Sequence, residues 1–395
     1  MSFVIATFNR RHVLLKTLRH VQGCGLPASD FETLVVDNAS SDGTADAVAA
    51  AFPRVRVIRL DANRGPCAKN MALRQASGEF VVFLDDDSYP EVGSLWQMIR
   101  HFQNDPKLGA AVFTIHLPNG SRECSAYPDV CIGCGTGFRR EALDEAGGLP
   151  EDFFMAAEEY DLSLRLLGSG WSVRTFGDLH VTHLKTQTSR FPSRIARLDA
   201  RNNVMLAMRY FPDRWRMRYA AAWLRRYQLM AGVNGNALAF YLGAAEGIAR
   251  GLRNEYTPIN SAAFERFSRV EQIYSQMAQQ ASTGNWRRVL MIDLGKNFIA
   301  WHDAAQRLGL EIAGIADQRL GGRGLRYRGI PLLSDDEAMT CGFNAAVISN
   351  LSPVHAGARL WQWKRRAGEA AIDLVYGATV NRRSAAAMPP LSIAA

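Results

Sequence analysis

The sequence predicts an α/β protein whose N-terminal part is a doubly wound parallel sheet. Two observations support this prediction: strand and helix patterns alternate between residues 2 and 87, and polar side chains follow the strands. The chain has 395 residues, of which 48% are hydrophobic and 21% charged, as in a globular protein with a large core. At roughly 150 residues per domain, the chain has room for two or three domains.

The strand and helix patterns follow one another in a regular order. Short apolar runs rich in β-branched and aromatic residues predict strands at 2–7, 31–40, 54–60 and 79–87. Apolar residues at helical spacing predict the intervening helices, at 10–22, 41–52 and 66–76. Either Ser41 or Asp42 would cap the second of these helices. Strands that alternate with helices in this way form parallel sheets.

Beyond about residue 190 the pattern changes twice. Residues 191–283 are helical and rich in arginine, and "STGNWRR" (282–288) is typical of a linker. A second alternation predicts strands at 288–295, 310–317, 345–350 and 371–377, and helices at 298–309 and 354–368. We therefore predict three domains, at 1–190, 191–283 and 284–395, the last with a frayed tail after Gly377.

The fourth predicted strand runs directly into three carboxylates, Asp85, Asp86 and Asp87. Adjacent like charges repel one another unless a cation joins them. The carboxyl ends of strands in open α/β sheets are also where ligands bind, and two other strands end in Thr7 and Asp37. Such a group of side chains suits a nucleotide and a hard divalent cation, Mg²⁺ or Mn²⁺, held by oxygen ligands. An acidic turn that points into water is the alternative.

Several motifs along the chain resemble those of the family 2 glycosyltransferases, which have the GT-A fold. In order, they are "VIATFNR", "VVDNASSDGT", "NRG…KN", "FLDDD", "GTGFRREALDEAGGLPEDFF", "EEYDLSLRLLGSGW" and "LHVTHLK". The resemblance covers about residues 3–185. It implies an enzyme of bacterial glycan or glycoconjugate biosynthesis that moves a sugar from a nucleotide-diphosphate sugar to an acceptor hydroxyl, with inversion at the anomeric carbon.

The same resemblance implies roles for individual residues. Asp85, Asp87 and His183 would hold Mn²⁺ or Mg²⁺, which neutralises the leaving diphosphate. Residues that would bind the donor are Thr7, Asn9, Arg10, Asp37 (which would read the base), Asn63, Lys69 and Asp86. Glu159 would be the general base that takes the proton of the acceptor hydroxyl.

The family usually has aspartate at the position of Glu159, so Glu158 and Asp161 stay open as alternatives for the base. Asp161 also suits an ion pair with Arg165, one helical turn later. Glutamate in place of aspartate is also compatible with a catalytically silent scaffold of this fold that binds a nucleotide-sugar. A nucleotidyltransferase would also join such a sheet to acidic metal ligands, but "ATFNRRHVLL" lacks the glycine-rich, basic loop that it needs after the first strand.

Two further motifs are weaker. Cys131 and Cys134 have the C-x-x-C spacing of a zinc site, without the second pair that a structural site requires. "VLMIDLGKNFIAWHDAAQRLGLEIAGIAD" faintly resembles the small Rossmann-like modules of polysaccharide-biosynthesis proteins. Gly295 stands alone where a G-x-G-x-x-G turn would bring the backbone close to a pyrophosphate. We therefore expect this domain to be structural or to mediate oligomerisation.

The net charge of +8 is concentrated between residues 187 and 256, where twelve arginines face four acidic residues. This stretch suits an anionic membrane surface or a diphosphate-linked lipid, with a solvated helical face as the alternative. We expect no nucleic-acid partner, since no known module accompanies the charge. Without a long apolar run or an export signal, we expect a cytoplasmic protein that meets a membrane only peripherally. The acceptor stays open as a glycan, a lipid-linked sugar or a small molecule.

Overall fold

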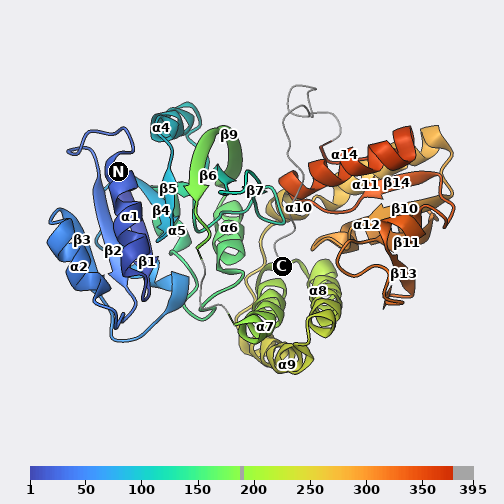
Figure 1. Ribbon diagram of the computed structural model, residues 1–395. Coiled ribbons are helices and arrows are strands. Elements are labelled where there is room, and N and C mark those ends of the chain that lie inside the picture. Colours follow the sequence, from blue (N-terminus) through green and yellow to red (C-terminus); the bar gives the residue numbers. More distant parts are fainter. Residues whose placement is uncertain (187–190, 377–395) are drawn as a thin grey trace. The chain divides into compact units, whose positions relative to one another are not determined.

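The computed structural model describes residues 1–186 and 191–376, and these divide into two compact units (Figure 1). The first unit comprises residues 1–125 and 129–186, and the second comprises 126–128 and 191–376. The expected frayed tail after Gly377 lies outside the described residues.

A nine-stranded mixed sheet forms the centre of the first unit. Its parallel half has the order β3–β2–β1–β4, from β1 (Ser2–Thr7), β2 (Glu32–Asp37), β3 (Val55–Arg59) and β4 (Phe80–Asp85). The sheet continues with β8 (Thr136–Arg139), β6 (Leu108–His116), β9 (Ser172–His183) and β5 (Ser88–Pro90), and β7 (Arg122–Glu123) pairs with β6. The parallel sheet that we predicted is therefore only the first half, because β8 runs antiparallel to both β4 and β6.

Helices pack on this sheet through their apolar faces. They are α1 (Arg11–Gln22), α2 (Thr44–Ala51), the 3₁₀ turn η1 (Gly65–Ala68), α3 (Lys69–Leu73), α4 (Ser94–Asn104), α5 (Arg140–Ala146) and α6 (Glu158–Gly168). Leu14 of α1 and Met98 of α4 belong to one buried core cluster with strand residues such as Val82. The N-cap of α2 is Gly43, not Ser41 or Asp42, although the Asp42 carboxylate accepts a hydrogen bond from the Thr44 N–H.

The second unit begins with a helical region. Its helices are α7 (Pro192–Tyr210), α8 (Asp213–Val233), α9 (Ala237–Arg253), α10 (Ser261–Ser268) and α11 (Val270–Gly284). Helix α11 continues to Gly284 and Trp286 is buried, so the linker that we predicted at 282–288 is wrong for its first residues. Within the described part of the chain, none of the helices is both long and apolar enough to cross a membrane.

A second sheet of six strands completes this unit, in the order β12–β13–β11–β10–β14–β15. Its elements are β10 (Arg288–Ile292), α12 (Phe298–Arg307), β11 (Glu311–Ala316), β12 (Arg326–Tyr327), β13 (Ile330–Leu333), α13 (Asp335–Ala338), β14 (Ala345–Ile348), α14 (Pro353–Ala367), the 3₁₀ turn η2 (Gly368–Ala370) and β15 (Ala371–Ile372). The predicted α/β pattern is therefore present, with a shorter last strand. The Rossmann-like assignment, and the division of this unit into two domains, stay predictions.

Candidate active site

The carboxyl end of β4 brings the three aspartates next to a histidine that is distant in sequence. Asp85 ends β4, and the short strand β5 that follows the triplet pairs antiparallel with β9, which places Ser88 opposite His183. As a result, ligand atoms of Asp85, Asp87 and His183 all lie within 4.8 Å of one another. The structure thus brings together the three residues that we predicted as metal ligands.

Asp87 is almost fully buried and is surrounded by donors. Its Oδ2 accepts hydrogen bonds from Arg10 Nη2 at 3.0 Å and from the Thr186 hydroxyl at 2.7 Å, and His183 Nε2 lies 3.2 Å from its Oδ1. Burial alone would raise the pKa of Asp87, but the hydrogen bonds from His183 and Thr186 outweigh it and lower the pKa below its usual range. This carboxylate is therefore ionised at neutral pH.

Asp85 is neutralised by Lys69, which we had expected to contact the donor. Lys69 is only 1% exposed, and its Nζ donates to Asp85 Oδ1 at 3.1 Å and to the Gly133 carbonyl at 2.8 Å. Burial would raise the pKa of Asp85, but the Lys69 ammonium lowers it. The contacts of Lys69 therefore hold the site's own groups in place.

Asp86 points to a different environment from its two neighbours. Its Oδ2 accepts a hydrogen bond from the Thr7 hydroxyl at 2.8 Å, and Arg10 Nε lies 3.3 Å from its Oδ1. Burial raises the pKa of Asp86 to about 7, against the attraction of Arg10. Thr7 and Asp86, both predicted donor contacts, are paired with each other, and Arg10 bridges Asp86 and Asp87.

Glu123 is a member of the site that the sequence did not reveal. Its Oε2 lies 2.8 Å from His183 Nδ1, so the imidazole is held between Glu123 and Asp87. Burial would lower the pKa of His183, but its hydrogen bonds to Asp87, Cys134 and Glu123 raise it to about 12. Glu123 lies in the two-residue strand β7, which carries no recognisable motif.

Glu159, the predicted base, lies in the first turn of α6 and faces Gly133. Its Oε1 accepts a hydrogen bond from the Gly133 N–H at 3.4 Å. A Cβ atom at Gly133 would lie 3.3 Å from this oxygen, 3.7 Å from Lys69 Nζ and 3.9 Å from Asp85 Oδ1. Glycine at 133 therefore leaves open the space that Glu159, Lys69 and Asp85 surround. Burial raises the pKa of Glu159, with a further contribution from the charge of Asp85.

The two alternatives for the base have other surroundings. Glu158 is 5% exposed, its Oε2 has no hydrogen-bond partner among the described residues, and burial followed by the charge of Glu159 raises its pKa well above the usual value. Asp161 forms the predicted ion pair with Arg165, at 2.5 Å. Asp161 is therefore engaged within its own helix.

The loop before α6 is held in an unusual backbone conformation. Phe154, Ala156 and Ala157 all have positive φ, between 63° and 69°, which is rare for residues other than glycine. A Cβ atom at Gly65 would lie 2.5 Å from the Phe154 carbonyl, so only glycine permits this close approach. Strained backbone of this kind is concentrated at functional sites. This loop sets the start of α6 and hence the position of Glu159.

The asparagine of the "KN" motif anchors the other end of this loop. Asn70 is buried, and its side-chain amide donates to the Leu149 carbonyl at 2.8 Å while its Oδ1 accepts from the Leu149 N–H at 2.9 Å. Gly148 has a φ of 75°, and a Cβ atom there would lie 2.7 Å from Asn70 Oδ1. The turn at Gly147 and Gly148 therefore fits closely around the Asn70 side chain.

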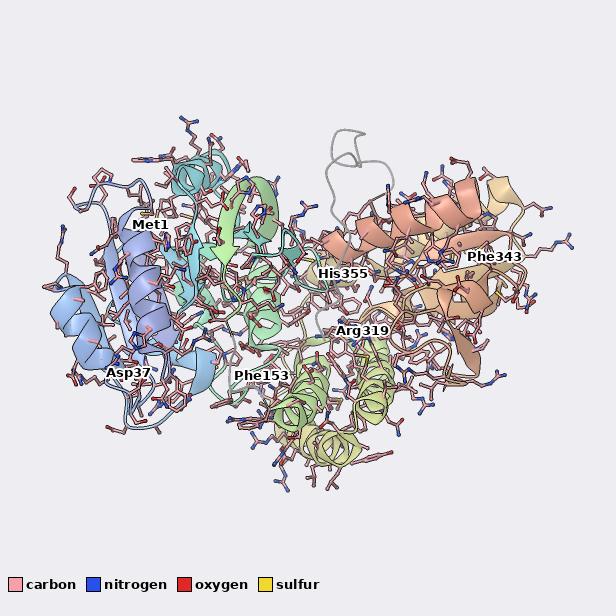
Figure 2. The ribbon with its side chains drawn as sticks, viewed as in Figure 1. Met1, Asp37, Phe153, Arg319, Phe343 and His355 are labelled. Atoms are coloured by element: carbon pink, nitrogen blue, oxygen red, sulfur yellow. The ribbon has the colours of Figure 1, made fainter. Side chains whose placement is uncertain are left out.

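The remaining predicted donor contacts lie around the ends of β2 and β3. Asp37, at the carboxyl end of β2 (Figure 2), is 4% exposed, and its Oδ1 has no hydrogen-bond partner within the described parts of the chain. Asn9 has a φ of 54°, and its Oδ1 accepts from the Ser41 N–H at 2.7 Å. Asn9 therefore ties the loop after β1 to the loop after β2.

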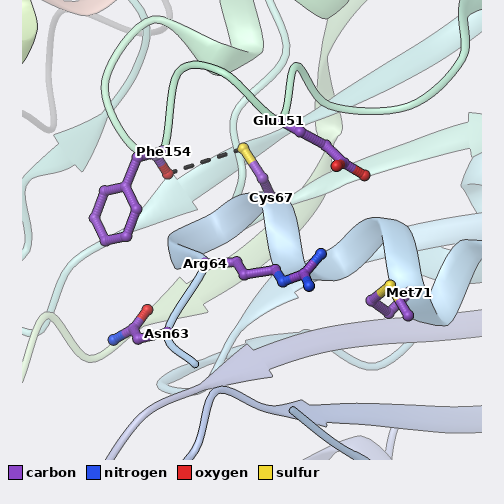
Figure 3. Close-up of a pocket in the computed structure, with 6 residues that line it drawn as sticks. All are labelled: Asn63, Arg64, Cys67, Met71, Glu151 and Phe154. Atoms are coloured by element: carbon purple, nitrogen blue, oxygen red, sulfur yellow. Dashed lines mark hydrogen bonds between the residues drawn. The ribbon is translucent and has the colours of Figure 1, made fainter. Parts of the chain in front are cut away.

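Asn63 lines a pocket of about 330 Å³ (Figure 3). The other lining residues are Arg64, Cys67, Met71, Glu151 and Phe154. In Figure 3 the loop that carries Glu151 and Phe154 lies along the helical segment that carries Cys67 and Met71. Arg64 is a polar residue of this pocket that we did not predict, although it lies inside the quoted "NRG" motif.

The cysteines of the C-x-x-C motif are buried, and the other histidine of the "LHVTHLK" motif lies beside another histidine. Cys131 and Cys134 are buried free thiols, and burial raises their pKa values to about 12 and about 11. Cys134 forms a three-residue group with Glu123 and His183 that could hold a metal ion. His180, the other histidine of the "LHVTHLK" motif, has its Nδ1 3.0 Å from His116 Nε2.

Comparisons with known proteins agree with this fold. Residues 2–128 match the family described as Glycosyl transferase family 2. A segment of 143 residues is 31% identical to poly-beta-1,6-N-acetyl-D-glucosamine synthase of Staphylococcus epidermidis, covering 34% of this chain and 34% of that synthase. The synthase of the same name from Staphylococcus aureus (strain COL) is 31% identical over 124 residues, 31% of this chain and 30% of the synthase. The chain thus spans about a third of the length of the curated relatives it matches.

Among solved structures, S. aureus TarS 1-349 in complex with UDP-GlcNAc is similar with a TM-score of 0.50. The sequence identity is 16%, and the similarity covers 78% of this chain and 92% of that chain, so it is evidence for the fold. The N-terminal unit therefore has the GT-A fold, and its residues 2–128 match the family 2 glycosyltransferases.

Proposed function

We propose that this chain is an inverting glycosyltransferase that moves a sugar from a nucleotide-diphosphate sugar to an acceptor hydroxyl in bacterial glycan synthesis. The observation that carries the proposal is the grouping of Asp85, Asp87 and His183 within 4.8 Å, at the carboxyl edge of the sheet. Glu159 faces the same space across Gly133. A metal-ligand set beside a candidate base suits transfer to a hydroxyl, because the base can take the proton and the metal can neutralise the leaving group.

The proposed ligand set suits Mn²⁺ or Mg²⁺. The two carboxylates match the preference of these ions for oxygen ligands. Glu123 holds one ring nitrogen of His183, as carboxylates commonly do beside metal-bound histidines, which leaves the other nitrogen to face the site. When bound, such an ion would supply positive charge to the leaving diphosphate. We therefore assign the metal to Asp85, Asp87 and His183, with Glu123 as the residue that orients the imidazole.

The nucleotide would be recognised at the ends of β2 and β3. Asp37 Oδ1 is buried and has no hydrogen-bond partner within residues 1–186 and 191–376, so it is available to an N–H group of a base. Asn63 and Arg64 line the neighbouring pocket with polar groups. Thr7, Asn9, Arg10, Lys69 and Asp86 contribute mainly by holding the aspartate turn and its flanking loops.

In the proposed reaction the acceptor oxygen forms a bond to the anomeric carbon while the bond from that carbon to the diphosphate breaks. Glu159 takes the proton of the acceptor hydroxyl, and the electron pair leaves with the diphosphate. A raised pKa suits a base that must hold a proton after the transfer, since general bases work best when their pKa lies near the operating pH. Lys69 keeps the Asp85 carboxylate and the Gly133 backbone in place throughout.

N-acetylglucosamine appears in the names of both synthase relatives, so UDP-GlcNAc is the first donor to test. The test is a thermal-shift panel of UDP, GDP, dTDP and CMP with and without Mn²⁺, followed by release of the nucleotide from the matching donor sugar. A ligand at a hundred times its dissociation constant stabilises the fold by roughly 2.7 kcal/mol, which such an assay detects.

We expect one nucleotide to give a shift that depends on Mn²⁺, and donor hydrolysis that Asp87→Ala abolishes. A shift without any turnover would favour the silent scaffold instead. Release of pyrophosphate from a nucleoside triphosphate and a sugar phosphate would favour the nucleotidyltransferase. No shift with any nucleotide would contradict the metal-site assignment. The proposed acceptor, whether a glycan, a lipid-linked sugar or a small molecule, is then sought with the identified donor.

A further inference from the structure

Helix α9 packs on α7 through a face that contains Phe240 and three glycines. It lies beside α7 and α8 in the second unit (Figure 1). Cβ atoms placed at Gly243 and Gly247 would lie 2.0 Å and 2.7 Å from the carbonyls of Arg197 and Arg201 on α7. Gly251, one turn later, is also buried. The two helix backbones are therefore in close contact at Gly243 and Gly247, where no side chain would fit.

The opposite face of α9 is apolar and exposed. Its side chains recur at helical spacing, which places them on one stripe about half a turn away from the glycines. We call this the α9 outer stripe: Leu238, Tyr241, Leu242, Ala245, Ile248, Ala249 and Leu252. Leu238 and Leu252 are 74% and 71% exposed, and Tyr241 is 55% exposed. A helix at the surface of a soluble protein normally turns its polar face outward, so an apolar face that is exposed to solvent marks a contact surface.

The charges beside the stripe are positive. Glu246, an acidic residue of α9, is paired with Arg197 of α7. Arg250 and Arg253, in the last turns of α9, are exposed, and no ion pair is found for either among the described residues. Arginine next to exposed leucine and tyrosine is the composition of helices that lie flat on anionic membranes.

Several other arginines of residues 191–256 make contacts within the unit. Arg201 is 9% exposed, Arg218 pairs with Asp303 at 2.6 Å, and Arg226 donates to the Leu294 carbonyl at 2.8 Å. The positive charge available to a partner is therefore localised, and part of it lies at the end of α9.

We propose that the α9 outer stripe docks on an anionic lipid surface, with α9 parallel to the membrane and its leucines among the headgroups. The helix has 17 residues, about 25 Å at the rise of an α-helix, which suits a helix lying in the interface. Arg250 and Arg253 supply the charge complementarity that favours anionic lipid over a second copy of the same apolar stripe. The proposal does not depend on the glycosyltransferase activity.

The test is co-sedimentation of the full chain with vesicles of phosphatidylglycerol and phosphatidylcholine, against vesicles of phosphatidylcholine alone. The wild type is expected to pellet with the anionic vesicles. The triple variant Leu238→Ser, Leu242→Ser, Leu252→Ser should lower the partition coefficient by about a thousandfold, because each of the three buried leucines contributes about tenfold. The double variant Arg250→Gln, Arg253→Gln should lower it by about tenfold, and less so in high salt.

A matched control replaces Val92, which is 76% exposed and lies in the first unit, with serine. Val92→Ser should bind vesicles like the wild type, and melting temperatures should show that every variant is folded. Wild-type protein that stays in the supernatant with anionic vesicles overturns the proposal. It is also overturned if the triple variant pellets normally, or if sedimentation velocity shows a wild-type dimer that the triple variant dissociates while vesicles bind neither protein.

Discussion

Replacing Gly133 with alanine should slow the reaction without unfolding the protein. The added methyl would lie 3.3 Å from Glu159 Oε1, 3.7 Å from Lys69 Nζ and 3.9 Å from Asp85 Oδ1, so it enters the space that these groups surround. The first of these contacts is tight enough to displace the carboxylate by a few tenths of an ångström. Misplacement of a catalytic group by about 1 Å can reduce the rate about a hundredfold, so we expect kcat to fall between about tenfold and a hundredfold.

The fold should tolerate this change. Gly133 does not have a positive φ, so alanine can adopt its backbone conformation, and its smaller entropy in the unfolded chain favours folding slightly. The assay is release of UDP from UDP-GlcNAc with Mn²⁺, together with the melting temperature. Gly177→Ala is the matched control, because a Cβ atom at Gly177 would meet no heavy atom within 4 Å. If Gly133→Ala kept at least half of the wild-type rate, the reacting atoms would not lie between Glu159 and Asp85.

Three further predictions concern the titrating groups of the site. Glu159→Gln should lower kcat by about a hundredfold or more, whereas Glu158→Gln should change kcat little. Because the base must be deprotonated, the wild-type kcat/KM should fall at acid pH, below a pKa higher than the usual 4.5 of glutamate. Equal losses of kcat in both variants would contradict the assignment of the base to Glu159. Because the pKa of Asp86 is raised from 3.8 to about 7, its stabilising effect is complete below pH 3.8 and is lost as the pH rises through 7, so the metal-free protein should lose about 3 kcal/mol of unfolding free energy between pH 5 and 8. Thermal unfolding of Asp86→Asn between pH 5 and 8 should not show this loss of unfolding free energy. An equal loss in the variant would show that another group causes it. Glu123→Gln should weaken the binding of Mn²⁺ about tenfold to a hundredfold, as measured by calorimetry, because Glu123 orients the His183 imidazole. Unchanged affinity would show that Glu123 does not support the metal site.

The parallel half of the first sheet could be predicted because each of its strands is a continuous apolar run. Val4, Val35 and Val82 are fully buried in such runs, and helices separate them in the sequence. The second half of the sheet, which joins antiparallel pairs to the parallel pair of β6 and β9, was not predicted. Strand β5 has only three residues, Ser88–Pro90, and its existence depends on pairing with β9, far along the chain. Pairings between distant segments leave no local pattern in the sequence.

The same distinction applies to the candidate site. Asp85, Asp87 and His183 belong to recognisable motifs, and the structure brings them together. Glu123 lies in a two-residue strand, and its role depends entirely on its distance to His183. Gly133 became informative only once the atoms around its missing Cβ were known.

Lys69 shows why the chemical type of a residue does not determine its role. The resemblance implied that Lys69 binds the donor, but this side chain is 1% exposed and its ammonium donates to Asp85 and to the Gly133 carbonyl. Only the burial of the whole side chain distinguishes the two roles, and burial depends on the tertiary packing around α3.

Three cationic groups surround the aspartate turn, so a metal ion that binds there must replace positive charge that is already present. Arg10, Lys69 and the protonated His183 already balance the carboxylates in the protein without metal. With a pKa of about 12, His183 must release a proton before its nitrogen can ligate an ion. The apparent affinity for Mn²⁺ should therefore rise about tenfold for each pH unit in weakly buffered solution, and the heat of binding should vary with the ionisation enthalpy of the buffer. Alkaline conditions would load this centre with metal most readily.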